Sequence, residues 1–126
     1  MTRQAVRTDG APAPAGAYSQ GIAAGGFLYT AGFGPQHPGT GEVAPTVGEQ
    51  TAQVLANISA VLAERGLTLA DVVKTTVHLH NLKADFAEFD AVYREHFEAP
   101  YPVRTTVGSE LAGILVEIDV VALLRD

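Results

Sequence analysis

Alternation of apolar and polar side chains predicts the strands of this chain. From Val72 to Leu79, β-branched and apolar residues recur at every second position, as in a strand with one buried face. Gly25-Gly26 separates two apolar segments, and such a pair suits a two-residue hairpin turn that needs positive φ. A turn around Ala112-Gly113 predicts a second hairpin between the last two strands. The predicted strands cover residues 3–8, 18–24, 27–31, 72–79, 103–107 and 115–124.

Two segments show the three-to-four-residue spacing of amphipathic helices. Thr46 followed by Glu49 fits a capping box, and Gly66 supplies the stop of this first helix. Its apolar face carries Val54, Leu55, Ile58, Val61 and Leu62. Asp85 followed by Glu88 repeats the capping pattern, and Pro100 ends the second segment. The aromatic side chains spaced for core packing in this segment are Phe86, Phe89, Tyr93 and Phe97.

The order of these elements, β-ββ-α-β-α-ββ, predicts one α+β domain over residues 1–126, with two helices on one face of a mixed sheet. Residues 32–45 contain too many Gly and Pro residues for a regular element and are expected to form a loop. The strand at 115–124 is apolar on both sides, and two helices can cover only one face of the sheet. We therefore expect a closed oligomer that packs sheet on sheet.

Composition and charge narrow the possible functions. The 126 residues include 8 basic and 14 acidic side chains, for a formal charge of −6, and the 47% of hydrophobic residues can form a folded core. Lys and Arg are few and scattered, which disfavours a nucleic-acid surface. The absence of Cys excludes disulfides and thiolate sites. No apolar run is long enough to span a membrane, so we expect a soluble, cytoplasmic protein.

Charged residues stand in two otherwise apolar strands. Glu117 and Asp119 share a face of the segment LVEIDVVALL, and a buried carboxylate needs a partner or a cleft. The predicted second hairpin brings Arg104 beside Glu117. The pair forms either a structural salt bridge or a cleft in which Arg104 binds a carboxylate and Glu117 handles water. Tyr18, which follows a segment rich in Pro and Gly, is either a core anchor or a wall of that cleft.

Two histidines share one face of a predicted strand. His78 and His80 are two residues apart, and Lys74 lies on the same side. They supply at most half of a metal site, because ligand sets need three or four members. We therefore expect a solvated face and no bound metal.

Seven segments spread over nearly the whole chain carry a family resemblance. In order they are PAPAGAYSQG, LYTAGFGPQHPGTGEV, EQTAQVLANISAVL, DVVKTTVHL, DFAEFDAVYREHF, PVRTTV and LVEIDVVA. Together they resemble the RidA/YjgF family of imine and enamine deaminases. The resemblance implies a fold like that of the small trimeric chorismate mutases and a homotrimer with clefts at the subunit interfaces. It also implies hydrolysis of reactive 2-imino acids and enamines, such as 2-aminoacrylate, to 2-keto acids and ammonia without a cofactor.

By position, the resemblance assigns roles to five residues of this chain. Arg104 corresponds to the arginine that clamps the substrate carboxylate, and Glu117 to the acid that positions the attacking water. Tyr18 and Phe86 are implied to line the cleft, and the backbone of Gly32 to approach the ligand.

Three positions depart from the common family pattern. Ala31 replaces Ser, Asp90 replaces Asn and Thr106 replaces Cys. Thr106 and Asp90 are still implied to contact the substrate. Thr106 can donate its hydroxyl, whereas an ionised Asp90 close to the site would repel carboxylate substrates.

Two other functions remain open from the sequence. One is a hydrolase that acts on another unstable enamine or on an N-acyl catabolic intermediate. The other is a non-catalytic trimer that binds 2-keto acids and regulates a partner enzyme. Retention of Glu117 together with Arg104 favours catalysis, because binding alone has little need of Glu117. The negative net charge makes ribonuclease activity the least favoured option.

Overall fold

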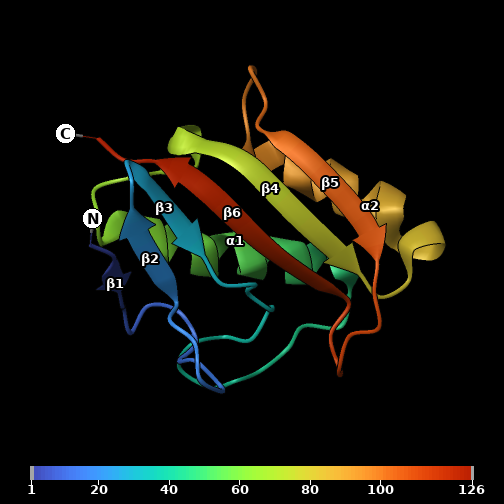
Figure 1. Ribbon diagram of the computed structural model, residues 1–126. Helices are drawn as coiled ribbons and strands as arrows, with labels where there is room; N and C mark the ends of the chain where they lie inside the picture. The colour runs from blue at the N-terminus through green and yellow to red at the C-terminus, as the bar shows by residue number, and fades with distance from the viewer. Residues whose placement is uncertain (1, 126) are drawn as a thin grey trace.

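Six strands form one mixed sheet in the computed structural model, which describes residues 2–125. The strands are β1 (Gln4–Val6), β2 (Gly21–Ala24), β3 (Phe27–Thr30), β4 (Val72–Leu79), β5 (Val103–Gly108) and β6 (Val116–Leu123). The helices are α1 (Val47–Ala63), α2 (Leu82–His96) and the short 3-10 helix η1 (Leu69–Asp71), which was not predicted. Figure 1 shows α1 and α2 together behind the sheet, which confirms the predicted α+β arrangement.

The order of strands in the sheet is β1-β2-β3-β6-β4-β5. Strands β4 and β5 are parallel, and α2 forms the crossover between them, whereas the other neighbouring pairs are antiparallel. The predicted hairpin between the last two strands is wrong, because β4 lies between β5 and β6 and pairs with both. The physical reason is burial. The inward side chains of β6 are almost completely buried, which suits a central strand, whereas β5 keeps partly exposed threonines at the edge.

Helix α1 begins and ends as the sequence predicts. The Thr46 hydroxyl accepts a hydrogen bond from the Glu49 backbone N–H at 3.2 Å and donates one to the Glu49 carboxylate at 2.8 Å. After Ala63 the chain turns away at Gly66, whose φ of 70° is a left-handed conformation that favours glycine. The five predicted apolar residues of this helix are completely buried.

Helix α2 differs from its predicted boundaries. It begins at Leu82 after Asn81 rather than at Asp85, and it ends at His96, well before Pro100. Glu88 does not cap its own helix. Its carboxylate accepts a hydrogen bond from the Gly48 backbone N–H at 2.8 Å, in the first turn of α1. The sequence pattern thus correctly predicts that the Glu88 carboxylate binds the start of a helix, but that helix is α1 and not α2.

The first hairpin is confirmed. Gly25 and Gly26 join β2 to β3 with φ values of 60° and 89°, which a side chain would disfavour. Strand β2 begins only at Gly21, so Tyr18 lies in the loop before it rather than in the predicted strand.

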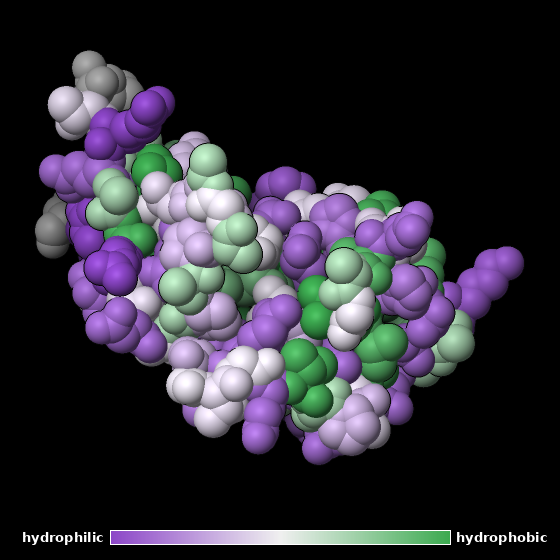
Figure 2. All heavy atoms as spheres, turned by 90° about the horizontal axis from the view of Figure 1, so that it is seen from below, coloured by the Kyte–Doolittle hydropathy of each residue, from purple (hydrophilic) through white to green (hydrophobic). Residues whose placement is uncertain are grey.

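The face of the sheet turned away from the helices, called the open face below, mixes apolar and charged side chains. Exposed on it are Tyr29, Val103 and Leu123, at 45%, 65% and 51%. The expectation that β6 is apolar on both sides holds for only part of the strand, because Glu117 and Asp119 occupy two of its outward positions. Figure 2 views the loop end of the molecule, where apolar and hydrophilic residues are likewise interspersed. No helix among the described residues is long and apolar enough to cross a membrane.

Candidate functional site

Arg104 lies in β5 and points toward α2. Its guanidinium carbon, Cζ, lies 4.7 Å from the ring centroid of Tyr93, 5.6 Å from that of Phe89 and 5.7 Å from that of Phe86. These rings come from one face of α2, and their π-systems attract the cation. Phe89 and Tyr93 are buried, which confirms their predicted packing role, whereas Phe86 stays 37% exposed at the edge of this aromatic surface.

Asp90 is the ion-pair partner of Arg104. Arg104 donates from Nη1 to Asp90 Oδ1 at 2.8 Å, and Arg94 donates to the other carboxylate oxygen at 3.2 Å. The hydrogen bond from Arg104 is the largest influence and lowers the pKa of Asp90 below its ordinary value, against the effect of burial and with help from Arg94. Asp90 is therefore ionised at neutral pH and neutralises part of the arginine's charge.

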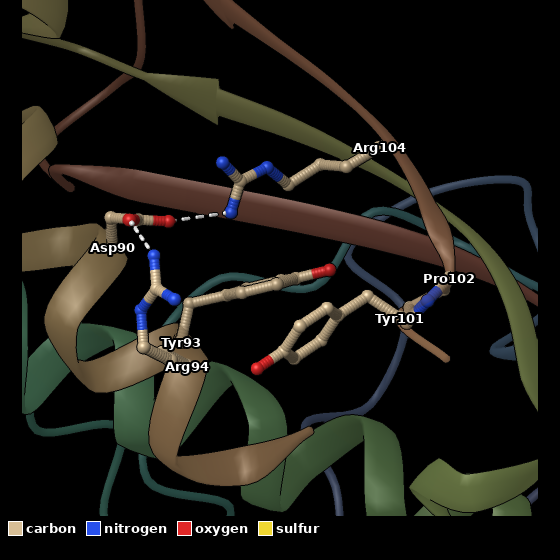
Figure 3. Close-up of a pocket in the computed structure, with 6 residues that line it drawn as sticks. All are labelled: Asp90, Tyr93, Arg94, Tyr101, Pro102 and Arg104. Atoms are coloured by element: carbon tan, nitrogen blue, oxygen red, sulfur yellow. Dashed lines mark hydrogen bonds and ion pairs between the residues drawn. The ribbon is translucent and has the colours of Figure 1, made fainter. Parts of the chain in front are cut away.

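A pocket of about 330 Å³ opens beside this ion pair. Figure 3 shows Arg104 and Asp90 on one side and the rings of Tyr93 and Tyr101 below them. The residues that line the pocket are Asp90, Tyr93, Arg94, Tyr101, Pro102 and Arg104. Tyr101 is 52% exposed, so this wall faces solvent in the single chain. The arrangement can hold a small anion that has an apolar part.

Glu117 lies on the open face, against Gly32. A Cβ atom on Gly32 would stand 2.7 Å from Glu117 Oε2, so any side chain at position 32 would displace the carboxylate. Phe33 fixes this approach, because its backbone N–H donates to the Ile118 carbonyl at 2.8 Å and its carbonyl accepts from the Ile118 N–H at 3.1 Å. The structure thus gives Gly32 a definite role beside Glu117, in addition to the ligand contact that the resemblance implies.

Arg104 and Glu117 do not meet within one chain. Arg104 aligns with Thr75 on the helix side of the sheet, and Glu117 aligns with His78 on the open face. The expected juxtaposition is wrong because β4 separates the two strands and the side chains leave opposite faces. The structural salt bridge between them is also wrong, since Arg104 pairs with Asp90 instead.

Thr106 and Tyr18, two further predicted site residues, lie in different parts of the fold. Thr106 follows Arg104 on the helix side of β5, aligned with the buried Val77. Tyr18 is 51% exposed, and its hydroxyl accepts a hydrogen bond from the Ala15 backbone N–H at 3.0 Å. Tyr18 is therefore a surface residue of its loop rather than a core anchor.

The sequence reasoning missed two features of the site. The sequence predicts Asp90 as a charge near the cleft and not as the arginine's partner, although its spacing from Phe86 and Tyr93 places all three on one helical face. His78 was expected to be solvated, but it is partly buried and its Nδ1 lies 2.6 Å from Ser109 Oγ. Among the described residues, no group of three or more His, Asp or Glu side chains is placed to hold a metal ion.

Comparison with known proteins gives one consistent picture. A family model described as Endoribonuclease L-PSP matches residues 8–124. A RutC family protein of Pyrococcus abyssi is 42% identical over 125 residues, covering 97% of this chain and 98% of the relative. The 2-iminobutanoate/2-iminopropanoate deaminase of Escherichia coli is 38% identical over 127 residues, covering 95% and 97%. The crystal structure of the YjgF gene product from E. coli superposes with a TM-score of 0.89 at 36% identity, covering 97% and 99%.

Proposed function

Because the chain belongs to the RidA/YjgF family, we propose that it hydrolyses reactive 2-imino acids and their enamine tautomers to 2-keto acids and ammonia. The single observation that carries this proposal is the guanidinium of Arg104, placed over the Tyr93 ring at the edge of an open pocket. A relative named as a deaminase of 2-iminobutanoate and 2-iminopropanoate supports the substrate class. We propose no cofactor, since an imine carbon is already electrophilic.

Arg104 is the proposed handle for the substrate carboxylate. Asp90 engages only Nη1 and leaves Nε and Nη2 of the guanidinium to other partners. These two donors form one edge of the guanidinium, and a carboxylate can accept two parallel hydrogen bonds from them. We propose that this places the imine carbon next to the pocket. Phe86 and Thr106 are proposed to contact the substrate.

Glu117 is the proposed proton acceptor. Its carboxylate takes a proton from water as the water oxygen bonds to the imine carbon, and the C=N π electrons move to nitrogen. Return of that proton to nitrogen gives a carbinolamine. Glu117 then moves the proton of its hydroxyl to nitrogen, so that the C–N bond breaks, ammonia leaves and the carbonyl of the 2-keto acid forms. Positioning accounts for much of the rate, because the handle and the water are held in fixed geometry.

The proposed site needs two chains. Arg104 and Glu117 leave opposite faces of the sheet, so one chain cannot bring them to a single substrate. A homotrimer in which the open face of one subunit presents Glu117, Gly32 and Tyr18 to the Arg104 pocket of the next would complete three equivalent sites. This arrangement also covers the apolar side chains of the open face.

Two variants and their mixture test the proposal. Arg104→Lys keeps a positive charge but loses the bidentate fork, and we expect imine hydrolysis to fall at least about a hundredfold. Glu117→Gln keeps the shape and removes the proton acceptor, so 2-keto acid binding should persist while turnover collapses. The assay generates imines from a panel of amino acids with an amino-acid oxidase and follows their loss. A folded Glu117→Gln protein with wild-type turnover contradicts the mechanism.

Mixing the two inactive variants tests the shared site directly. After subunits of Arg104→Lys and Glu117→Gln are mixed and reassembled, about one quarter of the interfaces should combine a native Arg104 with a native Glu117. Activity should recover to roughly that fraction. Each variant reassembled alone is the control, and a mixture that stays inactive after confirmed exchange contradicts a site shared between chains.

The Asp90–Arg104 ion pair favours a second candidate, a non-catalytic trimer that binds 2-keto acids and regulates a partner enzyme. Asp90 occupies part of the arginine's fork and places a negative charge where a substrate carboxylate binds. Under this alternative the wild-type protein binds 2-keto acids through Arg104 but turns over no imine. A hydrolase of another unstable enamine or N-acyl compound is the remaining alternative, and turnover of such compounds but not of 2-imino acids would identify it.

A further inference from the structure

Thr75 places a hydroxyl in the interior of the protein next to Arg104. It lies in β4, is completely buried, and is aligned with Arg104 in the parallel pair of β4 and β5. Aligned residues of neighbouring strands share a face of the sheet, so both side chains leave the helix side. A buried hydroxyl without a hydrogen bond is costly, which means that Thr75 needs a partner there. The reaction proposed above gives this residue no role.

The partner of Thr75 is Tyr93 of α2. The two hydroxyl oxygens lie 2.9 Å apart, and Tyr93 is only 5% exposed. Burial raises the pKa of the Tyr93 hydroxyl, against the smaller opposing effects of the hydrogen bond to Thr75 and of the charge on Arg104. The hydroxyl is therefore protonated at neutral pH, and the hydrogen bond joins β4 to α2.

The ring of Tyr93 also lies against Arg104. Of the three rings near the guanidinium, its centroid is the nearest to Cζ, at 4.7 Å. Figure 3 shows this ring below the guanidinium. The rings of Phe89 and Phe97 flank it, with centroids 5.4 Å and 4.5 Å from that of Tyr93. One phenol group thus contacts the guanidinium with its ring and β4 with its hydroxyl.

We propose that Thr75 is a positioning residue for ligand binding, which acts through Tyr93 to keep the free edge of the Arg104 guanidinium turned toward the pocket. Asp90 holds Nη1, and the fixed ring of Tyr93 supports the face of the same group. A side chain that is held in its binding orientation loses less conformational freedom when the ligand arrives. Loss of the Thr75 hydroxyl should therefore weaken binding and leave the chemical step nearly unchanged. This inference rests on the proposed function of Arg104 as the carboxylate handle.

The first test removes the hydroxyl and keeps the branched shape of the side chain. In Thr75→Val we expect KM for 2-imino acids and the Kd of pyruvate, measured by calorimetry, to rise about three- to tenfold, as for one lost hydrogen bond. The value of kcat should stay nearly the same. Thr75→Ser retains the hydroxyl and should keep the wild-type KM, even though the missing methyl group lowers stability.

Thr51→Val is the matched control. Thr51 is also completely buried, but its hydroxyl donates to the Val47 carbonyl within α1 at 2.7 Å. This variant loses a buried hydrogen bond far from Arg104 in the sequence and on another element. Urea unfolding is measured for all variants. We expect Thr51→Val to change stability but not KM, and a rise in KM equal to that of Thr75→Val would overturn the specific role of Thr75.

A double-mutant cycle shows whether Thr75 acts through Tyr93. Tyr93→Phe removes the other hydroxyl, and it also provides the test if Thr75→Val does not fold. If both residues act through one hydrogen bond, Kd of pyruvate in the double variant should rise no further than in the weaker-binding single variant. A rise equal to the product of the two single effects overturns the proposal. Wild-type KM in folded Thr75→Val and Tyr93→Phe proteins also overturns it, and the hydrogen bond is then purely structural.

A last measurement depends on neither turnover nor ligand. In the proton–nitrogen NMR spectrum, the Nε–H resonance of Arg104 should shift in Thr75→Val and stay in place in Thr75→Ser and Thr51→Val. An unchanged Arg104 resonance in Thr75→Val overturns the positioning role. If the resonance shifts but the wild-type protein neither hydrolyses imines nor binds 2-keto acids, the positioning of Arg104 stands and the proposed function fails, so the two failures are distinguishable.

Discussion

Asp90 shows how one side chain can restrain a binding residue. It holds Nη1 of Arg104 at 2.8 Å and is itself held by Arg94, so the arginine is both oriented and partly neutralised. Under the proposed function, a substrate carboxylate would bind to the other edge of the guanidinium, close to the negative charge of Asp90. We therefore expect Asp90 to favour substrates that tolerate a nearby anion and to weaken binding of simple carboxylates.

We predict that Asp90→Asn improves turnover of small 2-imino acids. An amide can still accept a hydrogen bond from Arg104, but it removes the charge that opposes the substrate carboxylate. The measurement is kcat/KM over a panel of imines derived from amino acids, with the improvement largest for the smallest substrates. Asp9→Asn, at an exposed surface ion pair, serves as the control. An unchanged substrate profile in Asp90→Asn contradicts this role.

The same substitution should change how stability depends on pH. The folded-state pKa of Asp90 is lowered, so its ionised form contributes stability above the unfolded-state value of about 4. That contribution is lost as pH falls through the lower folded-state value. At neutral pH we expect Asp90→Asn to lose up to about 1 kcal/mol of unfolding free energy. Urea unfolding at a series of pH values should show the difference from wild type shrinking below about pH 4, and a constant difference contradicts the assignment.

Among the elements, the loop between β3 and α1 controls the position of Glu117. Asn57 of α1 donates two hydrogen bonds of 3.0 Å, to the Gly34 and Gln36 carbonyls. Phe33, directly after Gly32, pairs with Ile118, and the backbone N–H of Ala31, directly before it, donates to the Gln20 carbonyl at 2.9 Å. The glycine is thus held against the carboxylate by contacts before and after it, and it leaves room for that carboxylate only because it has no side chain.

We predict that Gly32→Ala folds but loses most of its turnover. The new Cβ would lie 2.7 Å from Oε2 of Glu117, and the carboxylate, the mobile end of its side chain, would swing aside. Gly39→Ala is a matched control in the same loop, since its Cβ meets only the edge of the His37 ring at 3.3 Å. Imine turnover and thermal unfolding are measured for both. Wild-type turnover in a folded Gly32→Ala protein contradicts the requirement for this carboxylate position.

At the scale of the whole molecule, the open face predicts assembly. Apolar side chains such as Tyr29, Val103 and Leu123 remain exposed on it, while both helices cover the opposite face. Exposed apolar side chains on a sheet face that no helix covers are expected to be covered by a partner. Light scattering should therefore give the mass of three chains at micromolar concentration. A monodisperse monomer would contradict both the assembly and the shared site.

The sequence by itself determined the two main helices, most of the strands and the residue types available for chemistry. Local patterns are sufficient for the glycine hairpin at Gly25-Gly26, the Thr46 cap and the buried face of α1, because each depends on neighbours within a few positions. The matched segments also identified the family, and with it Arg104 and Glu117 as candidate site residues.

Only the tertiary structure decided which distant residues meet. The order of strands depends on burial over the whole sheet, so the sequence alone suggested a β5–β6 hairpin that β4 interrupts. The same non-local packing pairs Arg104 with Asp90, brings Ser109 to His78 and sends Glu88 to the start of α1. These contacts join residues that local spacing does not relate. Side-chain partners across a fold are therefore set by topology, which hydrophobic periodicity does not encode.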